Sequence, residues 1–244
     1  MSVVTPADIR AIPERYSIGK RPLSLLLGWG ELTYTRLLDG NSPSQQHAAE
    51  LRRLLDDPAA YARLLETGRD RVTDMAYMRS FRAVDRILAE QGGAIRATRI
   101  FAVADRICML AKGDLTPSAL QRLVYYAQGL SFAMLDDPLF DELPRAAASG
   151  PSYDRIYAGY SYDEIQRAAN AEIPMDSEIL GKREIEVIDT AYKRYGDNSG
   201  QALSRMSCEE GPWKKARKRA EAPEGEDSQE LITAKSMKKF FSKK

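Results

Sequence analysis

Few residues of this chain could carry enzyme chemistry. The one histidine, His47, leaves little material for a histidine-based triad or metal site, and the two cysteines, Cys108 and Cys208, lie far apart without a CxxC partner. The paired acids Asp136-Asp137 and Glu209-Glu210 each adjoin a helix end or a proline, which favours solvated capping groups over acid–base catalysts. Phosphate loops, GxSxG and HExxH are absent. We therefore expect a protein that is not an enzyme and uses no cofactor and no metal.

The charges nearly cancel over the whole chain. There are 36 Lys and Arg residues against 35 Asp and Glu residues, a formal net charge of +1. Any nucleic-acid contact must then come from local charge placement. The chain has no run of about 18 apolar residues, and its first dozen residues lack the apolar block of a signal peptide. These features predict a cytoplasmic protein that does not contact membranes.

A turn centred on a glycine near the N-terminus points to DNA binding. Ile9–Tyr16 is expected to form a first helix and Lys20–Leu27 a second, with Gly19 as the N-cap of the second. Gly28 can adopt the positive φ that a tight turn needs, and Trp29 can fill the gap between the helices. This spacing is typical of a helix-turn-helix unit.

Five polar residues around this turn are the candidate DNA contacts. Lys20 and Arg21 stand where they can bind phosphates, while Thr33 is expected to cap the third helix. Thr35 and Arg36 would then point towards a major groove, and Arg36 is the candidate for a guanine contact. The alternative is that a glycine between two amphipathic helices only mimics the motif.

The residues LLGWGELTYTR, from Leu26 to Arg36 and on to Gly40, with LLDDP at Leu54–Pro58, carry a family resemblance. The segment resembles the Xre-type helix-turn-helix of MqsA-like antitoxins over about residues 9–66. Gly19-Lys20 stands where the family has Ser-Gln, which leaves the usual Gln contact in doubt. The zinc ribbon of some relatives is absent, so the resemblance implies no metal here.

A second motif lies on a helix expected from Ser118 to about Leu135. Its adjacent Tyr125 and Tyr126 cannot, on helical spacing, both point inward, so one is expected at the surface as a protein contact. The alternative is that both pack in the core or at its rim.

The run LQRLVYYAQG at Leu120–Gly129, followed by Pro138-Leu139-Phe140, Gly150-Pro151, Tyr157 and Pro212-Trp213, looks like the Panacea domain. Arg122 replaces a common Lys, and Ala147 stands where a Trp is frequent. The resemblance covers about residues 98–220. It implies an all-helical antitoxin domain that binds a cognate toxin encoded beside it.

The candidate toxin contacts combine the aromatic cluster with nearby carboxylates that could engage basic residues of a toxin. They are Tyr125, Tyr126, Gln128, Asp137, Phe140, Asp141 and Glu142.

Helical periodicity dominates the chain, so we expect a mainly α fold with four parts. Residues 5–66 would form the helix-turn-helix domain, 67–97 a connecting helix and linker broken at Gly92-Gly93, and 98–220 the Panacea-like domain. The helix at Thr73–Gln91 is the candidate dimer element.

The last part, residues 221–244, is expected to be a disordered charged tail. It follows a basic block and consists of an acidic stretch and a second basic block with few apolar residues. The alternative is that Met237, Phe240 and Phe241 form a short helix that docks on a partner.

Taken together, the residues and the two resemblances predict an antitoxin of a type II toxin–antitoxin system. It would neutralise its toxin by direct binding and repress its operon as a homodimer on operator DNA. A transcriptional regulator without a toxin, or an adaptor that delivers a partner to a protease, are the alternatives.

Overall fold

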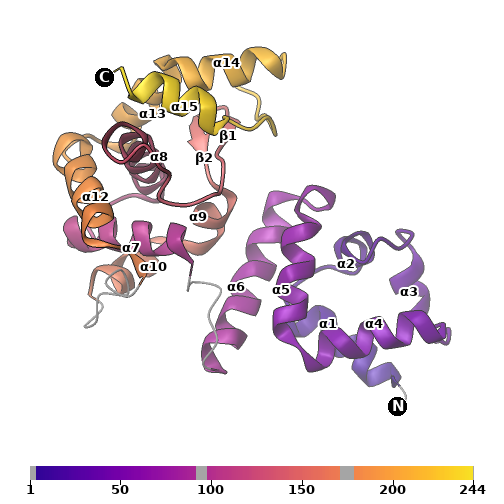
Figure 1. Ribbon diagram of the computed structural model, residues 1–244. Helices are drawn as coiled ribbons and strands as arrows, with labels where there is room; N and C mark the ends of the chain where they lie inside the picture. The colour runs from indigo at the N-terminus through magenta and orange to yellow at the C-terminus, as the bar shows by residue number, and fades with distance from the viewer. Residues whose placement is uncertain (1–3, 92–97, 171–178, 244) are drawn as a thin grey trace. The chain divides into compact units, whose positions relative to one another are not determined.

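The computed structural model describes residues 4–91, 98–170 and 179–243. The chain divides into two compact units, Met1–Arg96 and Ala97–Lys244, and both are mainly helical (Figure 1). The predicted mainly α fold is thus confirmed. The predicted break at Gly92-Gly93 lies outside the described residues.

The first unit consists of short helices whose starts are marked by capping residues. Thr5 accepts a hydrogen bond from the Asp8 amide while the Asp8 side chain accepts one from the Thr5 amide, a complete capping box. Asp57 caps the helix that Pro58 opens. The elements are α1 (Pro6–Arg15), α2 (Lys20–Leu26), α3 (Thr33–Leu38), α4 (Gln45–Asp56), α5 (Pro58–Thr67), the 3₁₀ turn η1 (Arg69–Arg71) and α6 (Asp74–Glu90).

Buried tyrosines hold the first unit together. Tyr16 stacks on Tyr61 with ring centroids 3.7 Å apart, and the Tyr16 hydroxyl donates to the Leu54 carbonyl at 2.7 Å. The Tyr61 hydroxyl is hydrogen-bonded to Ser80 of α6, and α6 packs along α5. Helix α6, which we expected to be a connecting element, is therefore part of this first unit.

The second unit surrounds one helix with the others. Its elements are α7 (Arg99–Leu110), α8 (Pro117–Met134), β1 (Arg145–Ala147), β2 (Gly150–Ser152), α9 (Asp154–Gly159), α10 (Tyr162–Ala169), α12 (Lys182–Tyr195), α13 (Gly200–Glu209), α14 (Gly211–Arg219) and α15 (Ala234–Phe241).

Helix α8 forms the centre of the second unit. Every residue from Ala119 to Phe132 is buried, and α7, α9, α12, α13, α15 and β2 all pack against the helix (Figure 1). A helix buried on all sides is a core element, and α8 therefore also places Gln121, Arg122 and Gln128 in the interior. None of the helices in the described part of the chain has the length and apolarity needed to span a membrane.

A small antiparallel hairpin interrupts the helices, so the second unit is not strictly all-helical. Strand β1 pairs with β2, with Ala146 opposite Pro151. Gly150 begins β2 directly after the turn and adopts φ +119°, a conformation that residues with a Cβ rarely adopt.

The prediction of a disordered tail is wrong. Residues 221–230 form a loop, Leu231 pairs with Arg145 of β1, and α15 follows with Met237 and Phe241 buried. Two of its apolar residues, Met237 and Phe241, lie on one face of a short helix, and Ile232 before that helix is also buried. The second unit supplies the surface that covers them. The helix that we considered as the alternative does form, and it docks on α8 of its own chain.

Candidate functional site

Two glutamines of α8 fix the chain on either side of the hairpin. The Gln121 amide donates to the Tyr153 carbonyl at 3.1 Å and accepts from the Tyr153 amide at 2.9 Å. Gln128 makes the same pair of hydrogen bonds with the chain before the hairpin. Its amide donates to the Phe140 carbonyl at 2.7 Å and accepts from the Leu139 amide at 2.8 Å. Each buried side chain satisfies both of its polar groups in this way. The glutamines therefore position the loop that follows α8.

Both tyrosines of the motif are buried, so the prediction that one would lie at the surface is wrong. Tyr125 and Tyr126 each have no exposed surface, because segments distant in the sequence cover both sides of α8. Tyr126 stacks on Tyr195 of α12 with centroids 4.0 Å apart. The Tyr125 hydroxyl donates to a carboxylate oxygen of Glu210 at 3.1 Å.

Burial also governs the ionisation of these tyrosines. Removal from water, followed by the Glu210 carboxylate, raises the pKa of Tyr125 well above its usual value, and the same two causes raise the pKa of Tyr126. The expectation that Glu209-Glu210 are solvated holds for Glu209 alone, since Glu210 is only 7% exposed.

Arg122, where the resemblance has a Lys, is a buried cation that binds backbone oxygens. Its guanidinium donates to the Pro151 carbonyl and, at 2.6 Å, to the Ser149 carbonyl, so it fastens the hairpin turn to α8. Removal from water lowers its pKa to about 10. A Cβ at Gly150 would lie 2.8 Å from the Arg122 Nε. Only glycine at this position therefore leaves room for the arginine.

Gly129, the last residue of the motif, accommodates the C-terminal helix. A Cβ at this position would lie 2.4 Å from the ring of Phe241. That ring packs edge-on against Tyr125 and Tyr126 at centroid distances of 5.6 and 6.3 Å. Helix α15 therefore packs against the part of α8 that carries the motif YYAQG.

The predicted toxin contacts separate into buried and exposed sets. Gln128 and Phe140 are 2% and 3% exposed, and with the two tyrosines they offer no side-chain surface to a partner. Asp137 and Asp141 are exposed on the loop after α8. Glu142 pairs with Arg155 of α9 at 2.8 Å.

The predicted toxin contacts did not include two exposed tyrosines that follow the hairpin in the chain, although Tyr157 was named among the motif residues. Tyr157 of α9 is 48% exposed and Tyr162 of α10 is 62% exposed. Exposed tyrosines are enriched in protein interfaces. The spacing of polar residues along these two short helices indicates that each helix buries only one face. This pattern could have shown that the tyrosine on the other face is exposed.

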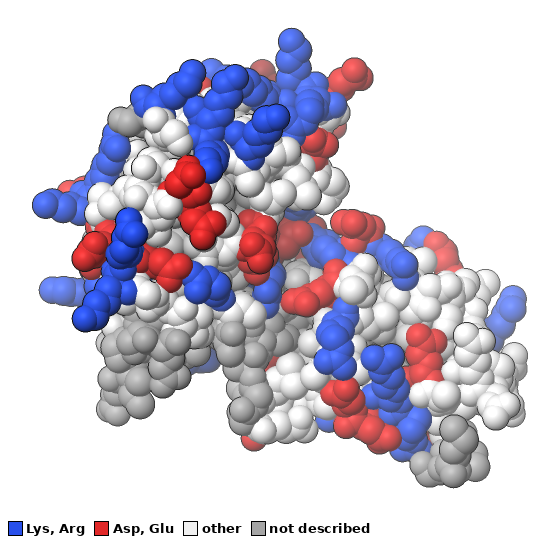
Figure 2. Space-filling view, in the orientation of Figure 1, with Lys and Arg blue, Asp and Glu red and all other residues white. Residues whose placement is uncertain are grey.

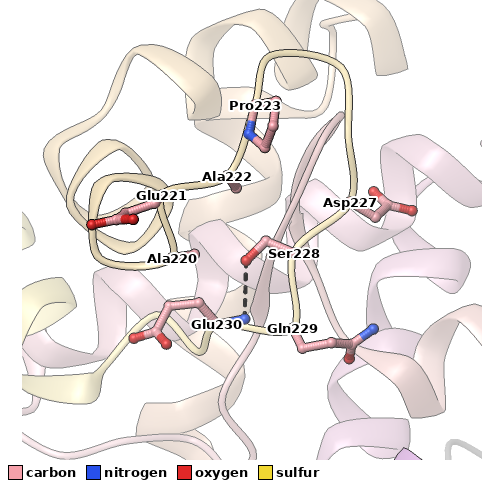
Figure 3. A pocket seen from close by; sticks show the side chains of 8 residues that line it. All are labelled: Ala220, Glu221, Ala222, Pro223, Asp227, Ser228, Gln229 and Glu230. Carbon is pink, nitrogen blue, oxygen red and sulfur yellow. Dashed lines mark hydrogen bonds between the residues drawn. The ribbon is translucent and has the colours of Figure 1, made fainter.

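An acidic loop joins α14 to α15 and surrounds a hollow of about 440 Å³ (Figure 3). The buried Arg217 holds this loop by donating to the Glu226 carbonyl at 2.6 Å and to the Pro223 carbonyl. In Figure 3 the carboxylates of Glu221, Asp227 and Glu230 point apart. No cluster of three His, Cys, Asp or Glu side chains that could hold a metal ion is found in the described ranges.

The turn in the first unit has the predicted glycine conformation. Gly28 adopts φ +71° and Gly40 φ +105°, ending α2 and α3 respectively. The buried Ser24 hydroxyl donates to the Gly30 carbonyl at 2.9 Å and accepts from the Tyr34 amide at 3.1 Å. The Trp29 ring lies against His47 of α4 with centroids 4.1 Å apart and the ring planes tilted by 34°, so it fills the space on that side.

The five predicted DNA contacts all lie around this turn. Arg36 is exposed on the face of α3 opposite the buried Tyr34 and Leu37, as predicted, and Thr35 is half-buried beside it. Thr33 begins α3 but does not cap it, because the N-cap position belongs to Leu32.

Lys20 and Arg21 are exposed in the first turn of α2. Arg21 pairs with Glu31 at 2.8 Å, and both side chains are more than half exposed. An ion pair this exposed is weak, so the guanidinium can exchange its partner for a phosphate.

Comparison with known families identifies part of the second unit. Residues 120–214 match the family described as "Antitoxin SocA-like, Panacea domain". The match begins in α8 and ends in α14, so it covers most of the buried helix, the hairpin and the elements between them and α14, but neither α7 nor α15. No curated protein and no solved structure matches the chain. The second unit therefore carries an antitoxin-like Panacea domain, which supports a role in toxin–antitoxin biology.

Proposed function

We propose that this chain is the antitoxin of a type II toxin–antitoxin system and that its second unit neutralises a toxin protein by direct contact. The match of residues 120–214 to the SocA-like antitoxin domain carries the proposal. Helix α8, where that match starts, is buried from Ala119 to Phe132. We infer that the motif builds the domain and that the toxin binds a surface which the motif positions.

The loop after α8 is the surface that we propose for the toxin. Gln128 holds the loop at Leu139 and Phe140, which leaves Asp137 and Asp141 exposed on either side of the held residues. The Glu142–Arg155 ion pair ties the end of the loop to α9, where Tyr157 is exposed. Carboxylates beside a tyrosine suit a basic surface with an apolar pocket.

We further propose that the first unit binds operator DNA through α3. Arg36 and Thr35 would enter the major groove, while Lys20 and Arg21 would bind phosphates. The support is the exposure of these cations around a glycine turn that Ser24 fixes. A homodimer is part of this proposal, because such heads generally bind palindromes as dimers.

Co-expression with the neighbouring reading frame tests the antitoxin function. We expect the neighbour to arrest growth alone and to be harmless together with this chain. A neighbour that is harmless by itself would favour a regulator without a toxin. Rescue that requires a cellular protease would favour an adaptor.

Charge reversal tests the proposed toxin surface. The variant Asp137→Lys with Asp141→Lys should lose rescue, whereas Glu186→Lys with Asp197→Lys, which reverses two exposed acids elsewhere on the unit, should keep it. Equal rescue by both variants would exclude this loop as the toxin contact. Light scattering that shows a strict monomer at micromolar concentration would remove the dimer.

A further inference from the structure

We propose that α14 and α15 form a second nucleic-acid surface, which binds the phosphodiester backbone without reading its sequence. We call it the lysine surface. It adds to the operator contact proposed for the first unit, and it needs no toxin. Its members are exposed lysines of α14, α15 and the turn after α15: Lys215, Lys218, Lys235, Lys239 and Lys243.

Two basic blocks that are separate in the sequence come together here. Helix α14 has five basic residues among nine and no acid, and α15 has three among eight and no acid. The helices pack against each other, and Figure 2 shows Lys and Arg side chains gathered over them. Ala216 and Arg217 of α14, and Met237 and Phe241 of α15, face the core. The lysines are therefore left on the outer face.

Three carboxylates near these lysines are paired with other cations, while Glu221, Glu224 and Glu226 are exposed on the loop between the two helices. Glu209 pairs with Lys214, Asp136 pairs with Lys238 at 2.7 Å, and Glu230 pairs with Arg219 at 2.7 Å. In the described part of the chain, the members of the lysine surface have no ion pair. Their charge is therefore available to an external anion.

The lysine surface contains a hollow between the two helices. Lys215, Lys239 and Lys243 line it together with the half-buried ring of Phe240, and its volume is about 320 Å³. Three ammonium groups around one shallow hollow create a positive potential in which a phosphate group fits. Arg217 does not contribute, because its guanidinium is buried and bound to carbonyl oxygens.

The composition of the surface favours nucleic acid over an acidic protein. Protein interfaces are enriched in aromatic residues and Arg and depleted of Lys, whereas Lys serves phosphates as a compact point charge. The large apolar residues of α14 and α15 are no more than half-exposed, so they provide no protruding anchor. The nine residues of α14 span roughly 13 Å, which corresponds to about four phosphates of one DNA strand.

The salt dependence of binding to a random-sequence DNA duplex tests the proposal in the full-length chain. We compare the wild type with a variant in which Lys215, Lys218, Lys239 and Lys243 are changed to Gln. Loss of four phosphate contacts should flatten the slope of log K against log salt by about 3 to 4 and weaken binding more than about tenfold at 0.1 M salt. By contrast, Arg36→Ala should change this slope by no more than about one.

A matched control removes the same charge from other places on the second unit. It changes Lys182, Arg183, Lys193 and Arg205 to Gln, four exposed cations without an ion pair in the described residues. The control should keep the wild-type slope. An unchanged slope in the lysine-surface variant, or equal flattening in the control, would overturn the proposal. So would loss of toxin neutralisation with the DNA slope retained, because the surface would then face a protein.

Discussion

Helices α3 and α8 carry the two sequence motifs, and the two motifs have opposite environments in the structure. Helix α3 has six residues and buries Tyr34 and Leu37, while Arg36 on its other face is exposed. Helix α8 has eighteen residues and is buried on all sides from Ala119 to Phe132. The motif of α3 thus leaves a charged side chain exposed to solvent, whereas the motif of α8 organises the domain. Substitutions in α8 should accordingly change stability first, and substitutions on the exposed face of α3 should change the proposed binding alone.

The largest effect is expected where α15 meets α8. Phe241→Ala removes a fully buried ring and should lower the free energy of unfolding of the second unit by about 3–5 kcal/mol. Urea denaturation followed by circular dichroism measures the loss. Phe240→Ala is the control, because this neighbouring ring is only half-buried and should cost less. Equal and small losses for both would mean that α15 does not seal the core.

The next largest effect comes from adding one methyl group under the same ring. Gly129→Ala places a Cβ against Phe241 and should lower the free energy of unfolding by about 1–3 kcal/mol. In the background of Phe241→Ala the ring is absent, so the same change should stabilise the helix by up to about 1 kcal/mol. A double-mutant cycle measures this change of sign, and additive effects would contradict the contact.

On α3 the expected effect is on binding. Arg36→Ala should weaken operator binding by about 1–3 kcal/mol and leave the unfolding curve unchanged, because the side chain is exposed. Arg53→Ala, an exposed arginine on α4, should leave binding intact. Fluorescence anisotropy with operator and random duplexes measures both. Destabilisation of the first unit by Arg36→Ala would contradict the proposed difference between α3, which exposes its motif residue for binding, and α8, whose motif holds its domain together.

The smallest effect concerns the caps of the first unit in acid. Hydrogen bonds from backbone amides hold the pKa of Asp57 below its usual value of 3.8. Because the folded-state pKa is the lower one, the stabilisation is complete above the unfolded-state pKa and is lost as the pH falls through the folded-state pKa. Asp57→Asn keeps a capping oxygen but cannot titrate, so its unfolding midpoint should depend less on acid pH. Chemical denaturation of both chains across the acid range tests this.

Local features were predictable where neighbouring residues decide them. The mainly α class, the positive φ of Gly28 and the outward face of Arg36 follow from helical spacing and glycine geometry, and the structure has all three. The candidate DNA contacts lie within residues 20–36, on two consecutive helices joined by the glycine turn. A local feature of the chain therefore brings them together, without any segment distant in the sequence.

The errors arose where segments distant in the sequence meet. Helical spacing places Tyr125 and Tyr126 on different sides of α8, and we assumed that one side meets water. Six other elements cover both sides instead. The tail seemed too polar to order itself, but Met237 and Phe241 lie on one face of α15, and Phe241 fills the space that Gly129 leaves.

The amino-acid sequence by itself determined the helices, the glycine turn and the residue types of both motifs, because capping, spacing and φ preference act over a few residues. Only the tertiary structure decided which faces are covered, because burial depends on elements up to about a hundred residues away, such as Phe241 over Gly129. The same is true of the lysine surface, since two blocks of charge become one only when α14 and α15 pack together.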